Sequence, residues 1–235
     1  MNPVLVLAHN NLPLTKRCVE SVGLQDVPCV ELFVVDNAST DNTRDWLRRE
    51  RIPHAHFSPQ LGVSAGWNYG LDWFFRQPEV EQVLVIGNDT YLPSNFYREI
   101  LGYSAPFVTG IHNMEAADTN PGVIGECPDF SAFLIRRDCW VTVGPFDDTM
   151  KCWASDCDYH VRATQMMMPL FKVNVPFGHD RSATLRNAHP DEQAALAKQA
   201  ELDREVFRGK WGCLPGTPEY NALFTSGKRP TLVLR

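Results

Sequence analysis

Three fully apolar runs in the first part of the chain each stop at a group of acids or amides. The runs are residues 4–7, 32–35 and 83–86, and the polar groups that follow them contain Asn10, Asp36 and Asp89. A strand that is apolar at every position is typical of the buried centre of a parallel sheet. The stretches between the runs are long enough for crossover helices. The sequence therefore predicts an α/β fold whose ligands bind where these strands end.

The composition allows a large buried core and favours no polyanion-binding surface. The chain has 235 residues, is 44% hydrophobic and carries a formal net charge of −6. This acidity argues against an extended face for nucleic acid, although a local basic stripe could still meet phosphates. Seven cysteines without metal-type spacing, and an apolar start no longer than a strand, predict reduced thiols and a cytoplasmic protein. No run approaches the roughly 20 apolar residues of a membrane span.

Periodicity and breaker residues predict the remaining elements. Helices are expected around Trp46 and over residues 13–22, 96–101, 156–168 and 190–208, with Asp191 as the cap of the last one. Further strands are expected over residues 107–111, 130–135 and 170–175. The polar segment 114–127 is expected to be a flexible loop, and the chain from Gly212 onward to be irregular.

Gly62, Gly66 and Gly70 stand at four-residue spacing before an expected helix at residues 71–75. Such small residues let a loop and the start of a helix press against a flat ligand or against the sheet. The spacing alone does not choose between ligand binding and plain helix–sheet packing.

The acids that follow the strands indicate a cation site. A carboxylate at a strand end would repel a phosphate, so the natural ligand for Asp89 is a divalent cation that itself holds phosphates. His179, after an expected turn at residues 176–178, could add an imidazole nitrogen and so favour Mn²⁺. Taken alone, a loop histidine is ordinarily just a polar side chain.

Asp156 and Asp158 stand two residues apart at an expected helix start, so their side chains diverge by about 200°. One can face a cleft while the other caps the helix or pairs with Arg162, and capping is the plainer interpretation of the pair. These residues by themselves indicate a metal-dependent enzyme that handles a phosphorylated ligand.

Taken in order, the motifs resemble glycosyltransferase family 2, inverting enzymes of the GT-A fold that use nucleotide-diphosphate sugars. The similarity begins at Asn10 and continues through residues 34–41, 62–70, 87–89, 144–147, 155–163, 210–212 and 215–216. It covers nearly the whole chain, and the ordered set is far more specific than any one motif. The resemblance implies a Rossmann-like, mostly parallel central sheet flanked by helices, with a C-terminal helix and an irregular tail.

The same resemblance implies one domain over residues 1–235 and a role for each candidate residue. Residues 1–112 would bind the nucleotide sugar, residues 113–189 would hold the acceptor and the catalytic group, and residues 190–235 would form the C-terminal helix and tail. Asp89 and His179 would bind Mn²⁺ or Mg²⁺, and Asp156 would deprotonate the acceptor hydroxyl as general base. A donor of the UDP or dTDP type is favoured. The residues expected to bind it are Ala8, Asn10, Asp36, Asn37, Ser39, Gly66, Asn68 and Asn88.

Two positions depart from the family pattern. Gly87 replaces the first acid of the Asp-x-Asp metal motif, and Ser155 replaces the Glu of the Glu-Asp-x-Asp motif that contains the base. These departures keep open a second class of function, a non-catalytic module that binds nucleotide sugars. A nucleotidyltransferase fits less well, because residues 9–13 do not form the Gly-rich basic loop that such an enzyme usually has after its first strand.

The acceptor is the least defined part of the site. A soluble or lipid-linked saccharide is expected, and hydroxylated bases of DNA are a second option. The expected acceptor walls are the segment 114–127 and the C-terminal segment. Peripheral membrane attachment through Trp211 and Leu214 is a further option, and the oligomeric state cannot be read from the sequence.

Overall fold

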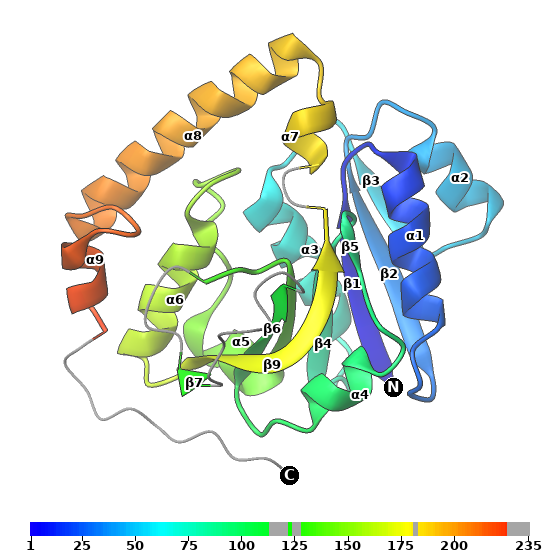
Figure 1. The fold of residues 1–235 in the computed structure, drawn as a ribbon, viewed down its shortest axis with the longest axis horizontal. Helices are drawn as coiled ribbons and strands as arrows, with labels where there is room; N and C mark the ends of the chain where they lie inside the picture. The colour runs from blue at the N-terminus through cyan, green and yellow to red at the C-terminus, as the bar shows by residue number, and fades with distance from the viewer. Residues whose placement is uncertain (113–121, 124–127, 181–182, 225–235) are drawn as a thin grey trace.

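The computed structural model of the protein describes residues 1–112, 122–123, 128–180 and 183–224 (Figure 1). Its strands are β1 (Asn2–Ala8), β2 (Val30–Asn37), β3 (His54–Phe57), β4 (Gln82–Gly87), β5 (Thr90–Tyr91), β6 (Phe107–His112), β7 (Gly122–Val123), β8 (Ala132–Arg136) and β9 (Leu170–His179). Its helices are α1 (Leu12–Gly23), α2 (Thr43–Arg49), α3 (Val63–Phe75), α4 (Phe96–Leu101), α5 (Arg137–Val143), α6 (Ser155–Gln165), α7 (Ala183–Asn187), α8 (Pro190–Trp211) and α9 (Pro218–Ala222).

The strands form one mixed sheet in the order β3-β2-β1-β4-β8-β6-β9-β5, with β7 paired to β9. β3, β2, β1 and β4 are parallel neighbours, β8 runs antiparallel between β4 and β6, and β9 is parallel to β6. The three apolar runs are therefore neighbouring strands whose carboxyl ends meet at one edge. The predicted α/β fold with a mostly parallel sheet is confirmed.

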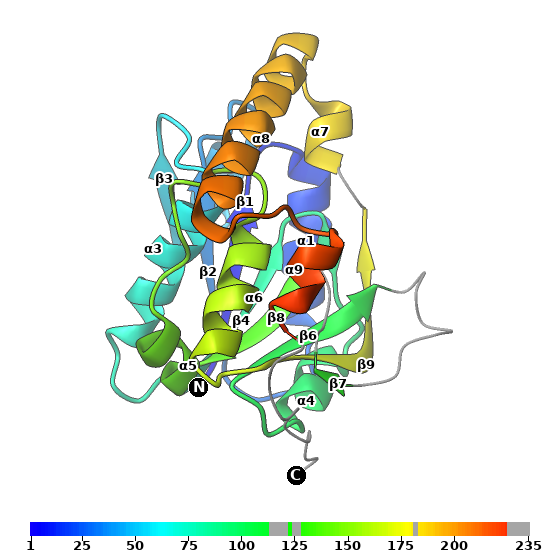
Figure 2. The ribbon, with the colours of Figure 1, turned by 90° about the vertical axis from the view of Figure 1, so that its left-hand side faces the viewer.

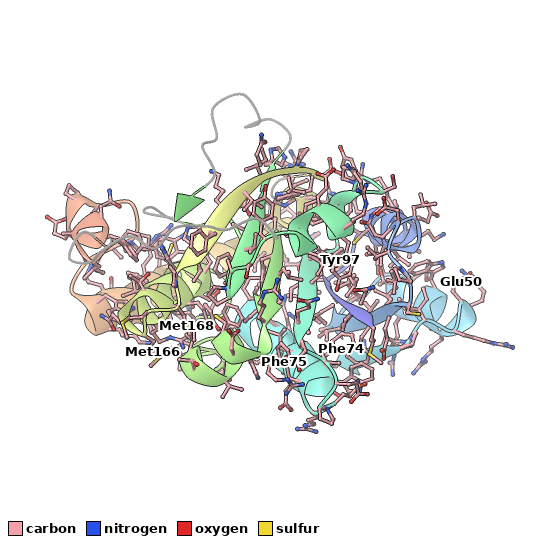
Figure 3. All side chains as sticks on the ribbon, turned by 90° about the horizontal axis from the view of Figure 1, so that it is seen from below. Glu50, Phe74, Phe75, Tyr97, Met166 and Met168 are labelled. Carbon is pink, nitrogen blue, oxygen red and sulfur yellow. The ribbon has the colours of Figure 1, made fainter. Side chains whose placement is uncertain are left out.

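Helices cover both faces of the sheet, which explains why its central strands are apolar at every position. Side chains alternate between the faces along a strand, so Val4 and Val6 of β1 face one core and Leu5 faces the other. α1, α2 and α4 complete the first core, and α3, α5 and α6 complete the second. Figure 3 shows Tyr97 of α4 and Phe74 of α3 on opposite sides of the sheet.

The glycine-rich segment differs from the prediction. α3 begins at Val63, so Gly66 and Gly70 lie inside the helix rather than in a loop before it. A Cβ on Gly66 would lie 2.5 Å from Cδ1 of Leu7, and one on Gly70 would lie 2.2 Å from Cδ1 of Leu5. These glycines let α3 approach β1 closely, so helix–sheet packing explains their spacing.

β9 is longer than predicted. Residues 176–178 continue the strand instead of forming a turn, so that β9 reaches His179. β9 pairs with β6 along most of its length and then, antiparallel, with β5 at its end. The Pro-x-Gly sequence is accommodated because the ladder with β6 shifts register between Thr109 and Ile111, just before Pro176 pairs.

The C-terminal region is more helical than predicted. α8 runs as far as Trp211, and its N-cap is His189, whose ring accepts the N–H of Asp191, rather than Asp191 itself. The tail that was expected to be irregular contains α9, which Thr217 caps. In the part of the chain that the structure describes, no helix is both long and apolar enough to cross a bilayer.

Two other boundaries differ from the prediction. α6 ends at Gln165 rather than at residue 168, because Met167 has a left-handed φ of 57°. Within the segment 114–127, residues 122 and 123 form β7 against β9. The rest of this predicted acceptor wall lies outside the described residues. The division at residues 112 and 189 stays a prediction.

Candidate active site

Side chains that were predicted to bind the donor tie together the loops after β1 and β2. The backbone N–H of Asn10 donates to Oγ of Ser39 at 2.8 Å, and Oδ1 of Asn10 accepts the N–H of Thr40 at 2.8 Å. Asn10 has a left-handed φ of 54°, which asparagine tolerates better than most residues. The side-chain amide of Asn37 bonds the backbone of the loop before α3. The strand ends are thus held in a defined shape.

Asp36 is fully buried at the end of β2, opposite Ala8 of β1. Its Oδ2 lies 2.7 Å from Nδ1 of His56, and its Oδ1 accepts the N–H of Ser39 at 2.9 Å. The parallel register of β2 and β3 places Asp36 directly beside His56. His56 therefore orients Asp36, a relationship that the sequence did not reveal.

Asn88 joins this cluster to the end of β4. Its backbone N–H donates to the carbonyl of Leu7 at 3.0 Å, and its Nδ2 donates to the carbonyl of Asn10 at 2.9 Å and to Oγ1 of Thr15 at 2.8 Å. The structure therefore brings six predicted donor-binding residues to one edge of the sheet: Ala8, Asn10, Asp36, Asn37, Ser39 and Asn88.

Pairing between β5 and β9 places His179 beside Asp89. Thr90 is the ladder partner of His179, and Oδ2 of Asp89 lies 3.3 Å from Nε2 of His179. Both side chains are largely shielded, with 16% and 13% of their surfaces exposed. The extension of β9 past the predicted turn is what delivers His179 to this point. The two predicted metal ligands are neighbours, and their binding of a metal stays a prediction.

The carboxylate of Asp89 fills the space beside Gly87, where the family pattern has another acid. A Cβ on Gly87 would lie 3.0 Å from Oδ1 of Asp89 and 3.9 Å from Oγ1 of Thr90. Among the described residues, no group of three His, Cys, Asp or Glu side chains is arranged to hold a metal ion.

Asp156 lies in the first turn of α6 and lines a cavity of about 300 Å³. Burial raises the pKa of Asp156 to about 6; the N–H of Cys157, which donates to Oδ1 at 2.8 Å, opposes the shift, and the negative charge of Asp129 adds to it. Such a carboxylate is ionised at neutral pH yet more basic than an ordinary aspartate. This combination suits a general base.

Asp129 connects this carboxylate to the end of β4. Its Oδ1 accepts the N–H of Ser131 at 2.9 Å, and the carbonyl of Ser131 accepts the N–H of Gly87 at 3.2 Å. The segment that carries Asp129 therefore runs beside the residue that precedes Asn88 and Asp89. The sequence contained no signal for Asp129, since its interaction with Asp156 depends on the antiparallel pairing of β4 and β8.

Asp158 is directed away from the cavity. It is fully buried, and its Oδ2 accepts Nε of Arg162 at 2.8 Å, which confirms the predicted divergence of the two acids. Its Oδ1 accepts the indole N–H of Trp211 at 2.9 Å and lies 2.7 Å from Nζ of Lys210. Trp211 is held in this way by the body of the protein, and the option of membrane attachment through it stays a prediction.

Two predicted donor-binding residues lie outside the cluster at the strand ends. Gly66 is inside α3, against Leu7. The side chain of Asn68 donates to the carbonyl of Phe146 at 2.9 Å and accepts its N–H at 2.8 Å. These contacts hold α3 to the sheet and to the turn after α5. A role for either residue in donor binding stays a prediction.

Comparison with protein families finds a match in the first part of the chain. Residues 4–105 match the family model described as glycosyl transferase family 2. The matched segment includes the strand-end cluster and Asp89. Over these residues the chain is similar to glycosyltransferase family 2.

Solved structures show that the chain shares its fold with larger proteins. The mannosyltransferase PcManGT from Pyrobaculum calidifontis, in complex with GDP-Man and Mn²⁺, superposes with a TM-score of 0.60 at 17% identity, over 94% of this chain and 67% of its own. Glucosyl-3-phosphoglycerate synthase from Mycobacterium tuberculosis, in complex with Mn²⁺, UDP and glucosyl-3-phosphoglycerate, gives 0.63 at 14% identity, over 92% and 81%. S. aureus TarS superposes with a TM-score of 0.59 at 16% identity, over 88% of this chain and 43% of its own. No curated protein sequence matches the chain.

The donor atoms at the sheet edge fit a divalent cation. Asp89 offers a hard carboxylate oxygen and His179 a ring nitrogen, a mixed set that Mn²⁺ accepts more readily than Mg²⁺. The short distance between Oδ2 of Asp89 and Nε2 of His179 allows one ion to reach both. The residues present therefore fit a cation with two protein ligands.

Helix α8 contacts the site at several points that the sequence did not reveal. Oε1 of Glu192 lies 2.8 Å from Nε2 of His9, just after β1, and α7 adds a hydrogen bond of 2.8 Å from Asn187 to Asn11. Figure 1 shows α7 and the start of α8 above the ends of the central strands. Further along α8, the buried Asp203 bonds the loop before α6. An acid on the apolar face of an amphipathic helix was the available signal for Asp203.

Proposed function

We propose that this protein is an inverting, metal-dependent glycosyltransferase that moves a sugar from a nucleotide-diphosphate sugar to an acceptor hydroxyl, with Asp156 as general base. The observation that carries the proposal is the placement of Asp156, with its pKa raised to about 6, in the wall of a cavity. The charge of Asp129 contributes to that raised pKa, and the segment of Asp129 is bonded through Ser131 to Gly87 at the end of β4. A base at this position can act on a hydroxyl close to a donor held at the strand ends.

The cluster of Asn10, Asp36, Ser39 and Asn88 would hold the nucleotide, with a UDP or dTDP donor favoured. Carboxylate and amide groups that are oriented by fixed hydrogen bonds can discriminate between nucleobases and contact a ribose. Asp89 and His179 would hold Mn²⁺ or Mg²⁺, which neutralises charge on the departing diphosphate when it is bound.

The reaction would proceed by direct displacement. Asp156 takes the proton from the acceptor hydroxyl, and the hydroxyl oxygen attacks the anomeric carbon from the side opposite the diphosphate. The bond from the anomeric carbon to the diphosphate oxygen breaks, and its electron pair leaves with the nucleoside diphosphate. A single displacement inverts the anomeric configuration, and it needs only one carboxylate base.

A non-catalytic module that binds nucleotide sugars is the second candidate, because Gly87 and Ser155 replace family acids. The missing acid at Gly87 is no further evidence for this module, because the carboxylate of Asp89 fills the space beside Gly87. Saccharides are the preferred acceptors, and hydroxylated DNA bases are the alternative.

A thermal-shift screen of nucleotide sugars, with and without Mn²⁺, tests the donor assignment, because a ligand that binds the native state raises the melting temperature. UDP- and dTDP-sugars should stabilise the protein, and more so with Mn²⁺. Release of nucleoside diphosphate in the presence of saccharide acceptors then separates the enzyme from the binding module. Metal-dependent binding without release, over many donors and acceptors, would favour the module.

A further inference from the structure

The cavity beside Asp156 has two tryptophans in its wall. Trp67 comes from α3 and Trp153 from the loop before α6, and Pro215 of the C-terminal segment completes this side. The volume of about 300 Å³ is at the small end of the range for ligand pockets. Pro215 belongs to the C-terminal segment that was expected to wall the acceptor site, and that role stays a prediction.

Trp153 is held from behind by α8. The carboxylate of Asp203, itself fully buried, accepts the backbone N–H of Trp153 at 2.9 Å and that of Cys152 at 2.8 Å. The guanidinium of Arg204 lies over the indole ring, 4.6 Å from its centroid. Figure 2 shows α8 passing alongside the start of α6. Two contacts from one helix thus fix both the backbone and the ring of Trp153 before any ligand binds.

The lining of the cavity selects a neutral, hydroxylated ligand. Among the described residues that line it there is no Lys or Arg, and Asp156 contributes a negative charge. A phosphate would be repelled there. A sugar ring, by contrast, has a C–H face that packs on an aromatic side chain and hydroxyls that donate to a carboxylate.

We propose that this cavity is an acceptor subsite for a pyranose ring, which stacks on Trp153 with one hydroxyl directed at Asp156. This rests on the proposed function, which needs an acceptor next to the base, and it goes further by naming the acceptor class and the residue that recognises it. Arg204 and Asp203 act through Trp153 and are positioning residues. Because the Trp153 ring is already fixed, less conformational entropy is lost when a monosaccharide unit binds to it.

Saturation-transfer NMR with a panel of methyl pyranosides tests the subsite without knowledge of the natural acceptor. Methyl glucosides, galactosides, mannosides and N-acetylglucosaminides are titrated into the protein, with and without UDP or dTDP and Mn²⁺. At least one should bind, with the strongest transfer to the ring C–H protons of one face. Trp153→Ala should weaken that pyranoside at least tenfold, and Trp153→Phe, which keeps an aromatic ring, less than threefold.

Trp140→Ala is the matched control. Trp140 is a partly buried tryptophan that lines a separate groove between α3 and α5 and stacks on Phe75. Its replacement should leave pyranoside affinity unchanged. Trp153→Leu provides a second ring-less variant that keeps apolar bulk, in case Trp153→Ala does not fold, and it should lose affinity as Trp153→Ala does.

The outcomes separate this proposal from the function on which it rests. Nucleotide binding with no bound pyranoside, or pyranoside affinity unchanged in both ring-less variants, overturns the subsite and leaves the donor site intact. Pyranoside binding that depends on Trp153, in a protein that binds no nucleotide, supports the subsite and contradicts the proposed transferase.

Discussion

The indole N–H of Trp211, the last residue of α8, donates a hydrogen bond of 2.9 Å to Oδ1 of the buried Asp158 in α6. Asp158 stands two residues from Asp156, so this bond attaches the C-terminal helix to the helix that carries the candidate base. Together with the contacts of Glu192 and Asp203, it means that α8 touches the strand ends, the loop before α6 and α6 itself. The C-terminal helix is therefore part of the site's framework.

Trp211→Phe should lower the free energy of unfolding by about 1–2 kcal/mol, because a buried carboxylate loses a donor and hydrogen bonds to charged groups are worth about 1.5–3 kcal/mol. Urea denaturation measures the change. Trp140→Phe, which makes the same indole-to-phenyl change at a ring that stacks on Phe75, is the control and should cost less than half as much. Equal losses would mean that ring area, and not the bond to Asp158, is responsible.

Asp156→Asn should abolish sugar transfer while leaving donor affinity near normal. It should also stabilise the protein at neutral pH, because the native state holds the proton of Asp156 up to about pH 6, well above its ordinary value of 3.8. The destabilisation caused by the raised pKa is absent below pH 3.8 and grows as the pH rises toward about 6. Above pH 6 it reaches up to about 3 kcal/mol. Melting curves of both proteins at pH 4 and 7.5 measure it, and transfer at the wild-type rate would sink the base assignment.

Transfer should lose activity on the acid side with an apparent pKa near 6, since Asp156 acts in its ionised form. Asp129→Asn should move this acidic limb of the pH–rate profile to lower pH, because the Asp129 charge raises the pKa of Asp156. Asparagine keeps an oxygen for the N–H of Ser131. Rate profiles of kcat/KM over pH 4–8 test both statements, and an unmoved limb in the variant contradicts the electrostatic link.

Asp89→Ala should remove metal-dependent donor binding, and His179→Ala should weaken Mn²⁺ by at least about tenfold. The loss for Mg²⁺ should be smaller in His179→Ala, because Mg²⁺ depends less on nitrogen ligands. Calorimetric titration of UDP at several concentrations of each ion gives the comparison. Mn²⁺ dependence that is unchanged in both variants would refute the metal pair.

Gly70→Ala should destabilise the fold by about 1–3 kcal/mol, because its Cβ would overlap the side chain of Leu5 in a packed core. Gly209→Ala is the matched control, since Gly209 lies in α8 with nothing within 4 Å of a new Cβ. There the same substitution should stabilise by about 0.5–1 kcal/mol through helix propensity. Chemical denaturation of the two variants should give opposite signs.

Elements that the sequence predicted well are those set by local pattern. The strands that end near Asn10, Asp36 and Asp89 were found from apolar runs, and the divergence of Asp156 and Asp158 followed from helical geometry alone. Predictions that depended on turn residues failed. Pro-x-Gly at residues 176–178 lies in a strand, and Gly66 and Gly70 lie in a helix, because pairing and close packing outweighed local preference.

By itself the sequence determined that three strands are buried on both faces and that their polar ends share an edge, since strands that are apolar at every position need a sheet covered on both faces. Tertiary structure alone decided which side chains meet there. His56 reaches Asp36 through the register of β2 and β3, His179 reaches Asp89 through the pairing of β5 with β9, and Asp203 reaches Trp153 through the packing of α8. Each contact joins segments distant in the chain, and its geometry depends on register and packing that no local pattern encodes.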